Sequence, residues 1–322
     1  MKSLITLLVS LYSFNTFAAS TLPGPLVETN WLSNNMSKVT LLDVRKDTKS
    51  FTRKPVFKRD AKTKKPKLSK VGGHIPGALL VNYKKIRSAR TINGKKVTRL
   101  VPSKTDFEAL MQTVGLNKGD AIVVVSKGQS NGDVTMATRL YWQLKYFGHK
   151  EVAILNGGMA QWIMDKRKIS KKARKVNRGN WVATAQDTSI LATSEDVSNA
   201  LKAKDTQLLD TRTMGLYLGT WNKSYVYAKG HIPGAKAYPA ELTTTNKMPV
   251  KLMPKTNTRN LLKAMNLNSD AKSITYCNSG HLASGSWFLM HEVLGNKQVK
   301  LYDGSMHQWT LEKNPTTTMK ME

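Results

Sequence analysis

Four short segments of this chain occur twice in the same order, and this duplication restricts its fold more than any other feature. The separation between matching residues falls slowly, from 167 for Asp43 and Asp210 to 147 for Trp162 and Trp309. Chance similarity does not preserve order, so the 322 residues are predicted to form two copies of one domain. The matching pairs are LLDVR at 41–45 with LLDTR at 208–212, GHIPGA at 73–78 and 230–235, apolar runs at 121–125 and 273–276, and NGGMAQW at 156–162 with DGSMHQW at 303–309.

Each copy alternates short apolar runs with amphipathic stretches. Val39–Val44 and Ala121–Val125 are typical of buried parallel strands, whereas Phe107–Val114 and Thr135–Tyr146 are typical of helices. The second copy repeats the pattern, with a helix expected over Ala283–Leu294. This alternation predicts an α/β fold of two tandem domains, each a mainly parallel sheet flanked by helices.

The repeats also suggest where the domains begin and end. We place the first domain at residues 22–165, a basic linker without apolar periodicity at 166–188, and the second domain at 189–322. The offset between the copies falls from 167 to 157 across residues 46–72, so the first copy has an insertion there. This insertion is rich in Lys and Pro and is interpreted as a surface loop.

The N-terminus has the pattern of a secretory signal peptide. Lys2 precedes the apolar run Leu4–Tyr12, which is too short to span a bilayer, and small residues follow at Ala18 and Ala19. We expect residues 1–18 to be a signal peptide, cleaved after Ala18 or Ala19, and the mature protein to be periplasmic.

The formal net charge is +30, and Lys and Arg gather in runs at 46–70, 84–99 and 166–178. Such a field attracts anions, and we interpret it as a solvated basic surface with weak association with anionic surfaces. Aromatic residues do not interleave with the basic runs and no zinc-finger spacing is present, so no specific nucleic-acid partner is expected.

Cys277 is the only cysteine in the sequence, so it cannot form an intramolecular disulfide. Free cysteines are often simply buried, but this one lies between the apolar run Ser273–Tyr276 and an expected helix. A polar loop in that place presents backbone N–H groups and a helix N-terminus to an anion, which stabilises a thiolate. We therefore predict that Cys277 is a nucleophile and that the loop binds the substrate through Asn278, Ser279, Gly280, His281, Leu282 and Ala283.

The first copy has Ser126 at the equivalent position, nine residues after Asn117 just as Cys277 comes nine residues after Asn268. A serine hydroxyl cannot carry a persulfide, and no Gly-x-Ser-x-Gly elbow surrounds Ser126. We expect the first domain to be inactive.

The paired LLDxR and GHIPGA segments, the Cys-x-x-Gly loop and the closing Gly-x-x-x-Trp resemble the tandem rhodanese family of thiosulfate and 3-mercaptopyruvate sulfurtransferases, over roughly residues 26–311. The resemblance implies that Cys277 takes sulfane sulfur from a small sulfur-containing anion such as thiosulfate, as a persulfide, and passes it to a thiol or to cyanide. It implies neither a metal nor an organic cofactor. It also implies that Asp210 and Arg212 are structural residues near the site, and that His74 and His231 of GHIPGA are turn residues.

Two departures from that family concern the donor. Leu216 stands where the family has an arginine that holds the donor's anionic end, and residues 277–283 contain no basic side chain unless His281 is protonated. Lys223, Lys229 and His281 are candidates for the missing charge.

Other functions compete with sulfur transfer. One is a persulfide carrier or sulfur-relay module that does not turn over, and another is a polyanion-binding protein that uses the basic first domain. Cysteine phosphatase chemistry is disfavoured, because Ala283 stands where the fold-related phosphatases have their loop arginine.

Overall fold

The computed structural model describes residues 20–319, so the expected signal peptide lies outside the described residues. Each copy of the repeat forms a five-stranded sheet in which all neighbouring strands are parallel. The first sheet has the order β1-β9-β8-β2-β5 and the second has β10-β14-β13-β11-β12, so both have the same topology. This confirms the predicted α/β fold with two tandem domains. The strands are β1 (Leu26–Val27), β2 (Thr40–Arg45), β5 (Leu79–Asn82), β8 (Ile122–Val125) and β9 (Val152–Leu155), then β10 (Leu191–Ala192), β11 (Gln207–Asp210), β12 (Lys236–Ala237), β13 (Ser273–Tyr276) and β14 (Val299–Tyr302).

Helices flank both sheets, and local caps explain where some of them begin. Ser103 accepts a hydrogen bond from the Asp106 N–H, and α2 therefore starts at Lys104, earlier than the apolar pattern predicts. Among residues 20–319, no helix has both the length and the apolar character needed to cross a bilayer. The helices are α1 (Thr29–Asn35), α2 (Lys104–Val114), α3 (Asn131–Tyr146) and α4 (Gly158–Met164), then α5 (Ser194–Ala203), α6 (Met214–Leu218), α7 (Lys255–Ala264), α8 (Ala283–Trp287) and α9 (Ser305–Leu311).

The helix expected over Ala283–Leu294 is only partly α-helical. It is α8 for five residues and then a π-helical turn, η5, over Phe288–Val293. The prediction of one continuous α-helix is therefore wrong for its second half, because apolar periodicity does not distinguish i→i+4 from i→i+5 hydrogen bonding.

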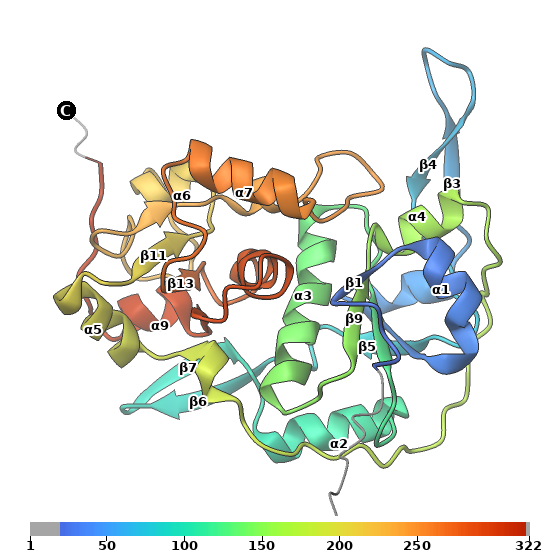
Figure 1. The fold of residues 1–322 in the computed structure, drawn as a ribbon, viewed down its shortest axis with the longest axis horizontal. Coiled ribbons are helices and arrows are strands. Elements are labelled where there is room, and N and C mark those ends of the chain that lie inside the picture. Colours follow the sequence, from blue (N-terminus) through green and yellow to red (C-terminus); the bar gives the residue numbers. More distant parts are fainter. Residues whose placement is uncertain (1–19, 320–322) are drawn as a thin grey trace, which may run out of the picture.

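Helix α3 of the first domain lies at the centre of the molecule, against α8 of the second domain (Figure 1). The hydroxyls of Thr138 and Ser284 are 2.8 Å apart across this contact. One hydrophobic cluster continues through it, from Val124 in the first sheet to Leu301 in the second. The two domains therefore share a core and are not joined by the linker alone.

The basic linker is bound to the first domain along much of its length. Residues 171–187 form neither helix nor strand, but Trp181 is buried and its N–H donates to the Leu116 carbonyl. The Asp187 N–H donates to the Tyr146 carbonyl at 2.7 Å, which brings the chain to the start of the second domain.

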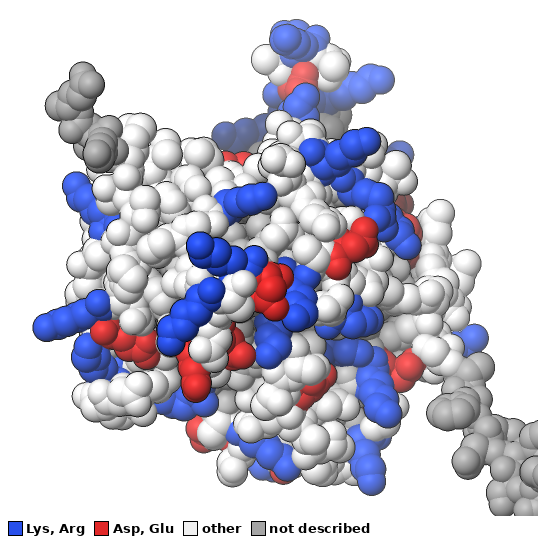
Figure 2. Space-filling model, turned by 60° about the vertical axis from the view of Figure 1, so that its left-hand side comes forward, with Lys and Arg blue, Asp and Glu red and all other residues white. Residues whose placement is uncertain are grey.

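The insertion at 46–72 contains a β-hairpin, formed by β3 (Val56–Arg59) and β4 (Pro66–Lys70), that projects from the first domain (Figure 1). The sequence prediction of a surface loop is therefore wrong for these strands, although all four residues of β3 are exposed. Lys and Arg are prominent on the visible face of the hairpin, which projects at the top of Figure 2.

A second hairpin, β6 (Ser88–Ile92) and β7 (Lys95–Leu100), extends from the first domain to the second. It contacts α9, and the Lys95 ammonium donates to the Leu311 carbonyl at 2.5 Å. The sequence signal for this hairpin is the Asn93-Gly94 turn, a pair that favours two-residue hairpin loops. The hairpin brings part of the basic run 84–99 against α9 of the second domain.

Candidate active site

Cys277 follows β13 directly and lies at the carboxyl end of the second sheet, where open α/β sheets bind ligands. Its side chain is buried, with 2% exposed, but it borders a cleft of about 1070 Å³ lined by residues of both domains. Asn278, Ser279, His281 and Leu282 line the same cleft. The structure thus brings four of the six predicted loop residues together with the thiol.

Gly280 and Ala283 do not line the cleft. The Gly280 N–H points instead to the Ser305 Oγ at 3.0 Å, and Ala283 is fully buried at the start of α8. Contact of these two residues with a substrate stays a prediction. Gly280 is required for another reason, because its φ is +67° and a Cβ there would come within 2.8 Å of the Arg139 Nη1.

Ser305 holds the cysteine loop in place from the neighbouring strand end. Its Oγ accepts hydrogen bonds from the N–H groups of Cys277 (3.1 Å) and Gly280 (3.0 Å) and donates to the Tyr302 carbonyl (2.7 Å). Ser305 itself has a φ of +50°, a conformation that costs free energy in residues other than glycine. The loop curls around this hydroxyl.

The remaining N–H groups of the loop are available to an anion. The Ser279 N–H is 3.5 Å from the Cys277 Sγ. Within residues 20–319, the N–H groups of Asn278, His281, Leu282 and Ala283 make no hydrogen bond to another residue. The Ser279 N–H is thus placed to stabilise negative charge on the sulfur, and the N–H groups without partners in the same loop can add to that stabilisation.

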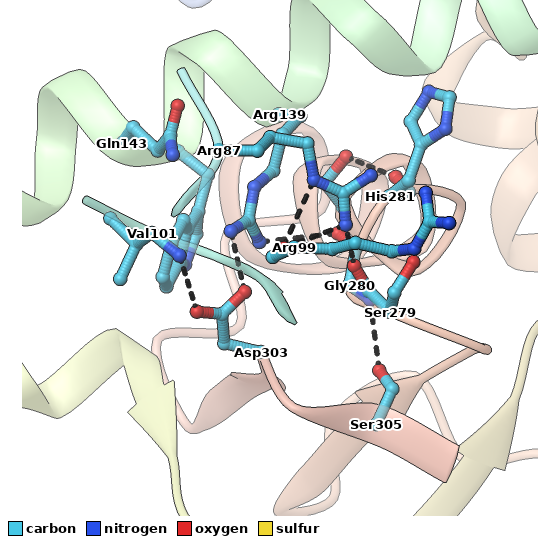
Figure 3. Close-up of polar contacts among 12 residues, drawn as sticks. Arg87, Arg99, Val101, Arg139, Gln143, Ser279, Gly280, His281, Asp303 and Ser305 are labelled. Carbon is cyan, nitrogen blue, oxygen red and sulfur yellow. Dashed lines mark hydrogen bonds and ion pairs between the residues drawn. The ribbon is translucent and has the colours of Figure 1, made fainter. Parts of the chain in front are cut away.

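Helix α3 of the first domain contacts the cysteine loop through Arg139, a contact that the sequence does not predict. The Arg139 guanidinium is fully buried and donates to the Gly280 carbonyl (3.3 Å) and to Asp303 Oδ1 (2.5 Å) (Figure 3). The other oxygen of Asp303 accepts the Val101 N–H at 2.8 Å. First-domain groups therefore fix both the loop and the strand end beside it.

His281 does not supply a positive charge. Burial, with a smaller effect of nearby Arg87, lowers the pKa of His281 from 6.5 to about 3, so the ring is neutral near pH 7. Its Nε2 lies 3.2 Å from the Gly132 carbonyl and 3.1 Å from the Thr135 hydroxyl. The imidazole thus joins the loop to α3.

Basic side chains of the first domain surround the cleft instead. Lys223, one of the predicted candidates, lines it, but Lys229 does not, and Leu216 is buried away from the lining. The two acidic residues of the lining are Asp47 and Asp133, of which Asp133 pairs with Lys127 at 3.5 Å. The cationic lining residues are Lys46, Lys84, Arg87, Arg99, Lys127 and Lys223, and all but the last come from the first domain.

Asp210 and Arg212 form a buried ion pair at the end of β11. The Arg212 Nη2 donates to Asp210 Oδ2 at 2.5 Å and to the Gly230 carbonyl at 2.7 Å. Asp43 and Arg45 make the same pair in the first copy, where Arg45 donates to the Gly73 carbonyl at 2.7 Å. In both copies the pair anchors the start of the GHIPGA segment.

The two GHIPGA histidines also occupy matching environments. His74 stacks on Phe51 and its Nδ1 lies 2.9 Å from the Phe51 carbonyl, while His231 stacks on Tyr217 with its Nδ1 2.7 Å from the Tyr217 carbonyl. Neither residue lines the cleft.

The first copy lacks an equivalent of the Ser305 hydroxyl as well as the thiol. Gly158 stands where the second copy has Ser305, and a Cβ at Gly158 would come within 2.7 Å of the Ser126 Oγ. The strand end and loop have closed onto each other there, leaving no room for an equivalent hydroxyl.

The duplicated parallel sheets, the curled cysteine loop at a strand end and the basic cleft between the domains define an enzyme of the sulfurtransferase class. The sequence model of the rhodanese-like domain family matches residues 28–165 and 193–312, and the chain belongs to this family. Within residues 20–319, no cluster of three or more His, Cys, Asp or Glu residues is arranged to bind a metal ion.

Known proteins similar to this chain include a thiosulfate sulfurtransferase and a sulfur carrier protein. A thiosulfate sulfurtransferase of Pseudomonas aeruginosa is 31% identical over 237 residues, 74% of this chain and 82% of that protein. The sulfur carrier protein TtuD of Thermus thermophilus is 28% identical over 298 residues, 89% of this chain and 94% of that protein. The structure of the 3-mercaptopyruvate sulfurtransferase SseA from Escherichia coli has the same fold, with a TM-score of 0.71 at 23% identity, covering 88% of this chain and 98% of that one.

Proposed function

We propose that this protein transfers sulfane sulfur from a small anionic donor such as thiosulfate to a thiophilic acceptor through a persulfide on Cys277. The thiolate attacks the outer sulfur of thiosulfate, an S–S bond forms to Cys277, and sulfite leaves with the electron pair of the broken S–S bond. Cyanide or a thiolate then attacks the outer sulfur of the persulfide, which restores the Cys277 thiolate. Both half-reactions are nucleophilic displacements that need no redox cofactor.

The observation that carries this proposal is the environment of the Cys277 sulfur. The Ser279 N–H lies 3.5 Å from it, and the loop has further N–H groups without partners in residues 20–319. Because the persulfide and the thiolate are both anionic, the same donors stabilise the sulfur before and after the transfer. Asn278, Ser279, His281 and Leu282 are the loop residues in position to contact the donor.

A rate measurement with a matched variant tests the proposal. Purified protein is mixed with thiosulfate and cyanide, and thiocyanate release is followed for the wild type and for Cys277→Ser. We expect the substitution to abolish turnover, because a hydroxyl cannot hold the transferred sulfur. Equal rates for the two proteins would refute the role of Cys277.

A persulfide carrier without turnover is the second candidate, and the similarity to a protein named as a sulfur carrier favours it. Mass spectrometry separates the two functions. A carrier gains one sulfur atom on Cys277 when exposed to a persulfide donor but releases no thiocyanate with thiosulfate and cyanide, whereas an enzyme does both.

The projecting β3–β4 hairpin is the surface on which polyanion binding would occur, a third candidate function. Retention on heparin that survives Cys277→Ser would support that function. Export to the periplasm depends on residues 1–18, and N-terminal sequencing of the mature protein would locate the cleavage site.

A further inference from the structure

Arg99 has an unusual backbone conformation beside the cleft. In the β6–β7 hairpin, Ser88 pairs with Leu100 and Arg90 pairs with Val97, so Thr98 and Arg99 together stand opposite Ala89. Arg99 in this β-bulge has a φ of +67°, a region that favours glycine. A residue other than glycine costs free energy in this conformation, and such strained residues cluster at functional sites.

The two residues of the bulge contact different residues of the second domain. The Thr98 N–H donates to the His307 Nε2 at 3.1 Å, which fastens the hairpin to α9. The Arg99 guanidinium lies 4.2 Å over the ring of Tyr225, and both residues line the cleft. Arg99 is exposed, and within residues 20–319 its side chain forms no hydrogen bond and no ion pair, so its N–H donors are free to bind a ligand in the cleft.

Arg87 connects Arg99 to the cysteine loop. Its Nε and Nη2 donate to the Arg99 carbonyl at 3.0 and 2.7 Å, and Nη2 also donates to the Ser279 carbonyl. The Arg87 Nη1 donates to the Tyr83 hydroxyl at 3.2 Å. Arg87 and Arg99 thus extend from the first domain toward Ser279 and Gly280 (Figure 3). Arg87 is a positioning residue, because most of its donors are used within the protein.

We infer that Arg99 of the first domain binds the oxyanion head of the sulfur donor, with Arg87 holding it in register with the Cys277 loop. This inference rests on the proposed function and identifies the donor class as a sulfur compound with a sulfonate-like or carboxylate head. A guanidinium presents paired N–H donors that match either head. The domain without the cysteine therefore supplies donor recognition.

The charges around the cleft favour Arg99 over the other cations. Lys127 is paired with Asp133, and no hydrogen bond in residues 20–319 ties Lys46, Lys84 or Lys223 to the cysteine loop. Among the cationic lining residues within 20–319, only Arg99 combines a guanidinium without a protein partner and a backbone joined, through Arg87, to Ser279. This joins the anion site to the loop that carries the thiol.

The inference is tested by anion binding in the Cys277→Ser background, where sulfur transfer is blocked. Thiosulfate and 3-mercaptopyruvate are titrated separately by calorimetry, which distinguishes the two kinds of head. Arg99→Gly is the chosen variant, because glycine is favoured at a φ of +67° and the substitution should leave the unfolding midpoint unchanged or raise it. Arg90→Ala is the matched control, since it removes one charge from the same hairpin outside the cleft.

We expect Arg99→Gly to weaken binding of at least one anion by about tenfold, as for loss of a charge-assisted hydrogen bond, and Arg90→Ala to leave the affinity unchanged. Equal losses of affinity in both variants would show that only the net charge of the hairpin matters, which would overturn the inference. An unchanged affinity in Arg99→Gly would overturn it as well. So would the absence of binding of either anion by the Cys277→Ser parent.

A second measurement uses the intact thiol and keeps the two proposals separable. Alkylation of Cys277 by anionic iodoacetate is compared with alkylation by neutral iodoacetamide. Arg99→Gly should lower the ratio of the two rates without lowering the iodoacetamide rate. If Cys277 reacts with neither reagent, the reactive thiol of the proposed function fails, while the calorimetric result still decides on Arg99.

Discussion

Ser305 is the residue on which the geometry of the cysteine loop most depends, because one buried hydroxyl accepts two of the loop's N–H groups. We predict that Ser305→Ala lowers the free energy of unfolding by about 1–3 kcal/mol, the usual effect of leaving buried donors unsatisfied. The rate of sulfur transfer should fall as well, since the N–H groups of the loop can then move away from the Cys277 sulfur. Chemical denaturation and thiocyanate release measure the two effects.

Ser286 provides the matched control for that substitution. It is fully buried on α8, and within residues 20–319 its Oγ has no hydrogen-bond partner. Ser286→Ala should therefore be neutral or stabilising and leave activity intact. A Ser286→Ala variant as impaired as Ser305→Ala would show that loss of any buried hydroxyl near the site explains the effect.

At the scale of elements, α3 and the strand end after β14 support the loop through one buried ion pair. Replacing Arg139 by Met leaves the Asp303 carboxylate buried without a cation, so we predict a loss of about 3–5 kcal/mol in unfolding free energy. The double variant Arg139→Met with Asp303→Leu should recover much of the stability but not the activity, because the Gly280 carbonyl and the Val101 N–H remain without their partners.

Denaturant unfolding and turnover of the single and double variants form the measurement for this pair. If the double variant regains activity along with stability, the ion pair is structural only. If Arg139→Met costs less than about 1 kcal/mol, the pair is more hydrated than its burial indicates.

Sequence patterns predicted the parallel strands and the cysteine loop because these depend on local signals. The run Ile122–Val125 is apolar throughout, and Cys277 follows a strand directly. Arg99 and Arg139 could not be assigned to the site in the same way. They are brought to Cys277 by a hairpin and a helix of the other domain, and neither residue carries a local signal for such a contact.

At the scale of the whole molecule, the interface between the domains contains polar contacts as well as the shared core. The Tyr141 hydroxyl of α3 donates to Glu292 of the second domain at 2.6 Å, and His291 lies 2.6 Å from the other carboxylate oxygen. Burial alone would raise the pKa of Glu292, but these hydrogen bonds and the charge of Lys297 outweigh it and lower the pKa from 4.5 to about 2. The ionised carboxylate thus stabilises the contact between the domains.

Because the core continues through both domains, we predict that the protein unfolds in one cooperative transition, with coincident fluorescence and circular dichroism curves. Two separate transitions would show that the domains fold independently.

The depressed pKa of Glu292 makes the contribution of this carboxylate to stability fully present above pH 4.5 and progressively lost as the pH falls toward 2. Glu292→Gln should therefore be less stable than the wild type at pH 7, and the difference should shrink on acidification. A stability difference between the two proteins that grows at low pH would contradict the ionised state of Glu292.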